Sequence, residues 1–179
     1  MINQSPKIVV GASSNCFVYG TLMSPEVLQT LIGRVPQMES PAYLPQGYTR
    51  HPVIGQVYPG VIRDCNIEQS SPLLIWTEIQ NTCTEGILLR NLNPTEMQIF
   101  DWFEDLDYTK TNVPVYLQGQ KDALTENTDV YIWSAGEEKL DLESSWSYEK
   151  FRQEKLNWFL EATVGPCRTA IDRIDFSAE

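Results

Sequence analysis

A short apolar run leads directly into a glycine turn and a helix start at residues 17–26, with the sequence FVYGTLMSPE. Ser24 is a favoured N-cap residue, Pro25 suits the first helical position, and Gly33 is typical of the residue that ends a helix. Backbone N–H groups at such a junction, together with the helix dipole, can hold a carboxylate or phosphate without a basic side chain. The sequence therefore predicts a strand, a turn and a helix in succession, with an anion-binding site at the turn.

A second helix is marked more strongly, and it ends among carboxylates. Asn93 and Glu96 have the spacing of a capping box, with Pro94 at the first helical position. Glu104 would stand at the end of this helix, where the helix dipole, nearby aspartates and burial all favour a protonated carboxyl and raise its pKa. A carboxyl tuned in this way can accept and return a proton near neutral pH. The alternative from composition alone is that this acidic helix end is a solvated tip.

Many short candidate strands and only two internal helices favour an α+β fold around a small mixed β-barrel. A polar stretch at 136–139 leads to a long C-terminal helix at about 147–163, which is expected to pack across the barrel. We therefore expect a loose N-terminal arm (1–15), a barrel domain (16–135) and a C-terminal helical extension (136–179). If the aromatic face of the last helix stays exposed, a homodimer is the natural explanation. The candidate strands are 17–19, 43–51, 53–62, 73–79, 86–91, 113–117 and 129–133.

Five segments resemble, in order and spacing, the gamma-glutamylcyclotransferase-like superfamily, and in particular its avirulence-induced-gene branch. The resemblance covers roughly residues 16–133. It rests on the Tyr-Gly-Thr-Leu turn, the Gly-Tyr-x-Arg strand, a Glu-Gly strand, a helix ending in Phe-Glu-x-x-x-Tyr and a last strand, at residues 19–22, 47–61, 85–89, 92–108 and 130–133. The resemblance implies a barrel with two short helices and a long C-terminal helix, and it implies that Glu104 is the catalytic acid/base.

The resemblance also implies a reaction in which the α-amine of a gamma-glutamyl compound attacks its own side-chain carbonyl and releases 5-oxoproline. N–H groups around Gly20, Thr21 and Leu22 would hold the α-carboxylate, and Glu104 would carry the proton to the leaving nitrogen. No cofactor, metal or covalent nucleophile is needed. The alternative is a non-catalytic small-molecule binding or interaction module with the same pocket.

Two tyrosines complete the candidate substrate-binding residues. Tyr108 matches the tyrosine of the family motif and could orient Glu104 or the substrate, with simple ring packing as the alternative. Tyr19 could hydrogen-bond near the turn, although a structural role is at least as common for a tyrosine at this place. His51, the only histidine of the chain, is expected to be structural or on the surface.

The chain departs from the family pattern after the catalytic glutamate. It has Asp105 where the family usually carries glycine and Lys110 where arginine is common, and the segment 64–83 is longer than usual. We expect Asp105 to point outward, because burying two adjacent carboxylates without a cation costs several kcal/mol. On that basis Asp105→Gly should change stability only slightly.

Composition narrows the possible partners and compartment. A net charge of −11 and a sequence pI near 4.5 argue against a nucleic-acid surface. No apolar run approaches the roughly 20 residues that cross a bilayer, and no secretory signal is visible, so we expect a cytoplasmic protein without a membrane partner. Four scattered cysteines and one histidine make a zinc site improbable. Free thiols are expected, with a disulfide between Cys65 and Cys83 as the alternative.

Overall fold

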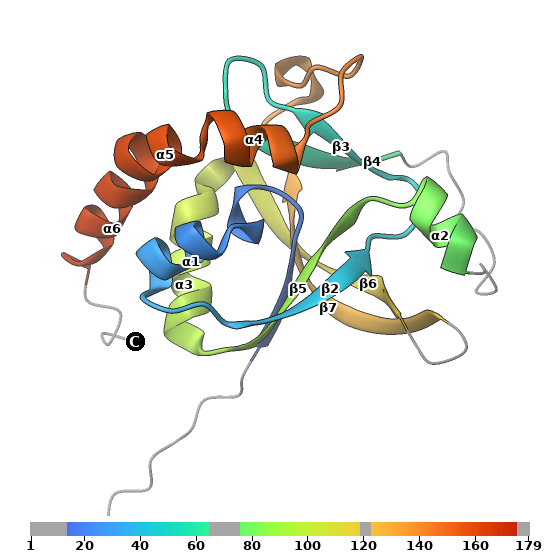
Figure 1. Cartoon of the computed structure of the whole chain (residues 1–179), viewed down its shortest axis with the longest axis horizontal. Coiled ribbons are helices and arrows are strands. Elements are labelled where there is room, and N and C mark those ends of the chain that lie inside the picture. Colours follow the sequence, from blue (N-terminus) through green and yellow to red (C-terminus); the bar gives the residue numbers. More distant parts are fainter. Residues whose placement is uncertain (1–13, 65–75, 119–122, 175–179) are drawn as a thin grey trace, which may run out of the picture.

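The computed structural model describes residues 14–64, 76–118 and 123–174. Five strands form a closed barrel in the order β1-β5-β2-β6-β7, which confirms the predicted α+β barrel (Figure 1). The pairs are antiparallel except β1 with β7, which run parallel and close the barrel. The strands are β1 (Ser14–Val18), β2 (Gln37–Tyr43), β5 (Glu85–Leu92), β6 (Tyr108–Gln118) and β7 (Ala123–Trp133).

Successive residues of β1 alternate between two apolar clusters, as expected for a strand with two covered faces. Phe17 packs with Leu88 and Val130 in a cluster drawn from several barrel strands, which is the interior of the barrel. Cys16 and Val18 instead join the cluster that contains the helices. Both clusters are almost fully buried, so β1 links the barrel interior to the helical layer.

A separate hairpin of β3 (Tyr48–Pro52) and β4 (Pro59–Arg63) forms its own two-stranded sheet. Two longer strands were predicted here, at 43–51 and 53–62; both overlap the observed strands, but their predicted bounds are wrong. Gly47 has a φ of 89° and breaks the first of them. The second begins with a turn, in which the Val53 N–H donates to the Tyr58 carbonyl at 3.2 Å.

The two internal helices begin and end as predicted. In α1 (Pro25–Ile32) the Ser24 side chain accepts from the Val27 N–H, and Gly33 ends the helix with a φ of 79°. In α3 (Pro94–Glu104) Asn93 and Glu96 form both bonds of the capping box. A short 3-10 turn, η1 (Thr21–Met23), joins β1 to α1, and η2 (Asp105–Asp107) follows α3.

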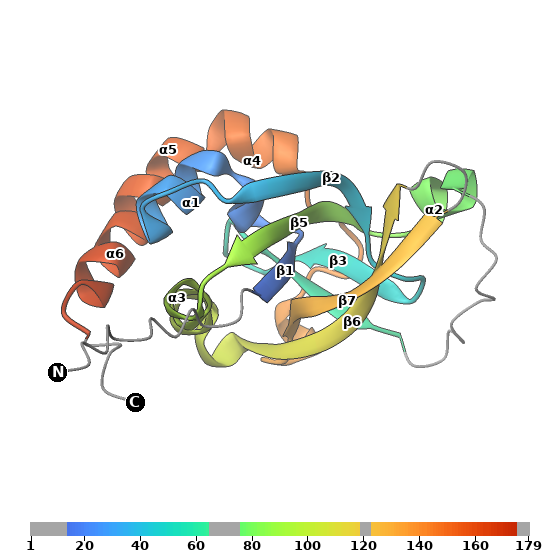
Figure 2. The same cartoon turned by 90° about the horizontal axis from the view of Figure 1, so that it is seen from below.

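The C-terminal helix is longer than predicted and is interrupted. It consists of α4 (Tyr148–Glu154), α5 (Leu156–Phe159), a π-helical turn η4 (Leu160–Val164) and α6 (Gly165–Ile171), and η3 (Glu137–Lys139) precedes it. Pro166 lacks the N–H that a regular helix would use, which accounts for the irregular turn before it. Both views place α1, α3 and this helix together on one side of the barrel (Figures 1 and 2).

The predicted strand 73–79 is wrong where it can be compared, because α2 (Trp76–Thr82) is a helix and residues 73–75 lie outside the described ranges. In α2 Ile79 is fully buried among exposed neighbours, a one-sided pattern that suits a helix rather than a strand. The strand β1 begins at Ser14, inside the predicted arm 1–15, and the rest of that arm is outside the described residues.

The remaining predictions from composition concern single residues. Cys16, Cys83 and Cys167 are free thiols, whereas Cys65 lies outside the described residues. His51 is partly exposed, with Nε2 3.2 Å from the Thr49 hydroxyl. Across the described ranges, every helix is too short or too polar to span a bilayer.

Candidate active site

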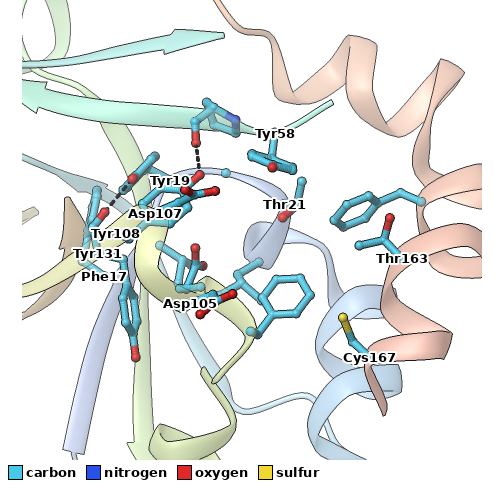
Figure 3. Close-up of a pocket in the computed structure, with 17 residues that line it drawn as sticks. Phe17, Tyr19, Thr21, Tyr58, Asp105, Asp107, Tyr108, Tyr131, Thr163 and Cys167 are labelled. Carbon is cyan, nitrogen blue, oxygen red and sulfur yellow. Dashed lines mark hydrogen bonds between the residues drawn. The ribbon is translucent and has the colours of Figure 1, made fainter. Parts of the chain in front are cut away.

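A cavity of about 220 Å³ opens at the junction of β1 and η1, bordered also by the end of α3, the β3–β4 hairpin and the C-terminal helix. Figure 3 shows Thr21, Asp105 and Thr163 converging on this space from three different elements. All six residues predicted for the site border it: Tyr19, Gly20, Thr21, Leu22, Glu104 and Tyr108. The structure thus brings the two sequence motifs, more than 80 positions apart in the chain, to one place.

The turn at residues 20–22 borders the cavity, and its first backbone N–H groups lack partners within the turn. Gly20 is the N-cap of η1, so the N–H groups of Thr21 and Leu22 have no partner inside that turn. A Cβ atom at Gly20 would lie 2.9 Å from Pro59 Cδ, so a larger residue here would push against the hairpin. Glycine is therefore required for this close approach.

Arg50 fixes the orientation of the peptide before the turn. Its Nη1 donates to the Tyr19 carbonyl at 2.7 Å and to the Glu85 carbonyl at 3.2 Å. The guanidinium also stacks over the Trp146 ring, 5.3 Å from its centroid. Because a trans peptide places its N–H opposite its C=O, the Gly20 N–H points away from Arg50. Sequence reasoning placed Arg50 only in a strand motif and missed this role.

The hydroxyl groups of Tyr19 and Tyr108 both bond the backbone. Tyr19 donates to the Tyr131 carbonyl at 2.5 Å and accepts from the Val61 N–H at 3.3 Å. Tyr108 donates to the Pro59 carbonyl at 2.8 Å. These bonds tie the β3–β4 hairpin to the barrel, which is the structural alternative considered for both residues. Both residues still border the cavity.

Glu104 is the last residue of α3, and its side chain lies in the cavity wall. Burial raises the pKa of its carboxyl to about 8, in the predicted direction. The pKa values of Tyr19 and Tyr108 are raised mainly by the burial of these two side chains and, second, by the negative charge of the Glu104 carboxylate. Within the described ranges no hydrogen bond or ion pair to the Glu104 carboxyl is found. The group is thus free to exchange a proton with a molecule in the cavity.

Carboxylates dominate the charged lining. Asp105 and Asp107 border the cavity beside Glu104, and no Lys, Arg or His does so among the residues that the structure describes. Lys110, the nearest cation in sequence, pairs with Asp101 at 2.8 Å instead. The described residues also bring together no group of three potential metal ligands.

Asp105 is exposed at the rim of the cavity, but its backbone is unusual. It has φ 51° and ψ −151°, a combination that favours glycine. This conformation is one that glycine adopts without strain, so it favours a larger stability effect of Asp105→Gly than the slight one expected from the sequence. The sequence already showed Asp105 in place of the family glycine, but sequence reasoning did not infer from it that this residue has a positive φ.

Replacing Asp105 by glycine is expected to raise the free energy of unfolding by about 1 kcal/mol. Relief of backbone strain contributes about 1–3 kcal/mol, and the greater freedom of glycine in the unfolded chain offsets part of it. Urea denaturation of the two proteins measures the difference. Asn91→Gly is the matched control, because Asn91 also has a positive φ of 57° but asparagine tolerates it. A variant of Asp105 no more stable than the parent would show that the backbone here is unstrained.

Sequence reasoning also missed the cavity residues that come from outside the motifs. Tyr58 lies within the predicted strand 53–62, but in the structure it borders the cavity from the turn before β4. Phe159, Thr163 and Cys167 reach the cavity from the C-terminal helix. Their spacing of four residues marks a shared helical face, but it does not say which surface that face covers.

Comparison with known proteins agrees with the fold and with the motifs. The family model described as "Gamma-glutamyl cyclotransferase, AIG2-like" matches residues 16–150. AIG2-like protein D of Arabidopsis thaliana is 31% identical over 147 residues, covering 82% of this chain and 84% of its own length. AIG2-like protein C of the same plant is 30% identical over 152 residues, covering 85% and 77%.

A solved structure shows the same fold at lower identity. One solution structure from Arabidopsis thaliana superposes with a TM-score of 0.56 at 21% identity, covering 90% of this chain and 83% of that one. At this identity the likeness concerns the fold alone, whereas the matched sequence spans the barrel, the turn and the helix that carries Glu104. The chain therefore belongs to the gamma-glutamyl cyclotransferase, AIG2-like family.

Proposed function

We propose that this chain is a cyclotransferase that releases 5-oxoproline and a free amine from a gamma-glutamyl amine, amide or peptide. The observation that carries the proposal is the carboxyl of Glu104, with a pKa of about 8, in the wall of the cavity that the residue 20–22 turn also borders. Membership of a family that includes gamma-glutamyl cyclotransferases supports the same reaction class.

The α-carboxylate of the substrate would bind the N–H groups of Gly20, Thr21 and Leu22. The described lining offers no basic side chain for this anion, so backbone donors carry the binding. The α-ammonium group then lies toward Glu104. Its positive charge favours the ionised carboxylate, which converts Glu104 into a base at neutral pH.

Glu104 takes one proton from the α-ammonium group, and the resulting amine attacks the side-chain carbonyl carbon. A bond forms between the α-nitrogen and that carbon to close a five-membered ring. As the bond to the leaving nitrogen breaks, that nitrogen gains the proton from Glu104, which serves as acid after serving as base. The ring nitrogen then gives its remaining extra proton to the Glu104 carboxylate, which leaves 5-oxoproline with an uncharged ring nitrogen, the free amine and a protonated Glu104. Holding the substrate in a bent conformation supplies much of the acceleration, because both reacting groups belong to one molecule.

Incubation with a panel of gamma-glutamyl compounds tests the proposal. At least one compound should give 5-oxoproline and an equal amount of free amine. The matching α-glutamyl amides are the control, since attack of their α-amine on the amide carbonyl cannot form a five-membered ring and cannot release the amine. The competing function, a binding module, predicts that a gamma-glutamyl compound raises the melting temperature while no 5-oxoproline forms.

A further inference from the structure

The C-terminal helix supplies one wall of the cavity, although most of it lies beyond the family-matched residues 16–150. Phe159, Thr163 and Cys167 border the cavity at intervals of four residues. Figure 3 shows Thr163 and Cys167 projecting from this helix toward the cavity. The wall therefore lies outside the barrel and outside the motifs that carry Glu104 and the residue 20–22 turn.

Specific contacts hold this helix in register against the catalytic helix. The Phe159 ring packs edge-on against Phe103, with ring centroids 6.5 Å apart, and Phe103 directly precedes Glu104. Arg168 donates to the Leu31 carbonyl at 2.8 Å and anchors α6 to the end of α1. The helix is thus a fixed wall beside the acid/base.

The π-helical turn η4 sets which side chains face the cavity. Gly165 N–H donates to the Leu160 carbonyl, five residues back, instead of four. One extra residue in a turn rotates the following side chains by about 100° relative to a regular α-helix. In a regular α-helix Phe159 and Cys167 would lie about 80° apart around the axis, and the wider turn brings them closer to one line along the cavity.

The chemistry of this side of the cavity is apolar with a negative rim. Phe103 and Phe159 present rings, Thr163 presents a hydroxyl, and the charged side chains of the described lining are all carboxylates. A leaving group next to them meets apolar surface and negative charge. A carboxylate on that group would be repelled, whereas an uncharged or cationic amine would not.

We propose that Phe159, Thr163 and Cys167 form the subsite for the leaving amine, and that this subsite takes uncharged or cationic amines with an aliphatic or aromatic chain in preference to amines that bear a carboxylate. The inference rests on the proposed cyclotransferase function. In that reaction the residue 20–22 turn holds the α-carboxylate and Glu104 contacts both nitrogens. The leaving amine then extends from Glu104 along Phe103 toward Phe159.

Gamma-glutamylglycine and gamma-glutamylglycinamide test the charge selection, because they differ only in a carboxylate or a carboxamide on the leaving group. The expected kcat/KM at pH 7 is about tenfold higher for the glycinamide, and added salt should narrow the difference. Asp107→Asn should narrow it as well, since Asp107 is a rim carboxylate. Equal kcat/KM values for the two compounds would overturn the charge selection.

Gamma-glutamyl methylamide and benzylamide test the position of the subsite. Thr163→Trp fills the proposed space and should lower kcat/KM for the benzylamide about tenfold more than for the methylamide. Thr169→Trp is the matched control, because Thr169 is exposed on the same helix and does not border the cavity. If Thr163→Trp lowers kcat/KM equally for both amides, the leaving group does not bind next to Thr163.

Calorimetric binding of the same four compounds separates this inference from the proposed reaction. If wild-type protein yields no 5-oxoproline from any gamma-glutamyl compound, the proposed reaction fails. The subsite is then supported if gamma-glutamylglycinamide binds about tenfold more tightly than gamma-glutamylglycine. Thr163→Trp should also weaken the binding of gamma-glutamyl benzylamide more than that of gamma-glutamyl methylamide. It falls if both comparisons give equal affinities.

Discussion

Replacing Glu104 by glutamine is expected to lower kcat on a gamma-glutamyl substrate by about 100- to 10,000-fold, the range typical of a lost general acid/base. Glutamine keeps the shape of the side chain but cannot shuttle the proton between the two nitrogens. KM should change little, because the N–H groups of the residue 20–22 turn carry the binding of the α-carboxylate. Release of 5-oxoproline measures the loss, and circular dichroism reports that the fold is retained.

Asp101→Asn is the control for this result. Asp101 is an exposed carboxylate one turn earlier in α3, and it does not border the cavity. Its oxygens accept from Lys110 and from the Tyr131 hydroxyl, and an asparagine oxygen can keep the second of these bonds. The control makes the same carboxyl-to-amide change in the same helix and should alter kcat less than about threefold. Near-normal turnover by Glu104→Gln would rule out Glu104 as the acid/base.

The elements that the sequence predicts correctly are those with complete local signals. Ser24 and Asn93 cap their helices through bonds to residues only three positions away, so sequence and structure must agree there. The segment before Cys83 has no such signal, and its apolar run suits a buried strand as well as a helix. The predicted C-terminal helix ends at about residue 163, before Gly165 and Pro166, yet in the structure Pro166 stands in the first turn of a further helix, α6.

The residues of the candidate site likewise fall into two groups, those that local sequence signals predict and those that depend on tertiary packing. Glu104 and the residue 20–22 turn are predicted from the family motifs, because those motifs lie in the barrel and in the two capped helices. Phe159 and Thr163 depend on how a distant helix packs and on an extra residue in one of its turns. Neither the packing of this helix nor the extra residue in its turn can be predicted from the local spacing of residues. The positive φ of Asp105 lies between these cases, since a missing family glycine signals a backbone constraint without giving its angle.

The pKa of Glu104 predicts a large pH dependence of stability. An exposed glutamate titrates near pH 4.3, whereas burial raises the pKa of Glu104 to about 8 in the folded protein. Between these values the folded protein keeps a proton that the unfolded chain has released. The free energy of unfolding therefore falls as the pH rises through this window. The contribution of the protonated carboxyl is fully present below about pH 4.3 and is lost above about pH 8.

Comparison of wild type with Glu104→Gln isolates this contribution. Glu26, Glu96 and Glu126 have pKa values lowered by hydrogen bonds and ion pairs, so their contributions are lost as the pH falls, in the opposite sense. These groups are present in both proteins and cancel in the difference. Glutamine stays neutral at every pH, so the variant should be about 2–4 kcal/mol more stable than wild type at pH 8.5.

The difference should shrink steadily toward pH 4.5, where both side chains are uncharged. Urea denaturation of the two proteins at pH 4.5, 6.5 and 8.5 measures it. Stability differences that do not vary with pH would mean that the Glu104 carboxyl titrates normally in the folded protein. Suppose that Glu104→Gln loses turnover and that its stability relative to wild type increases as the pH rises. Burial of this carboxyl then serves the reaction and lowers the stability of the folded protein.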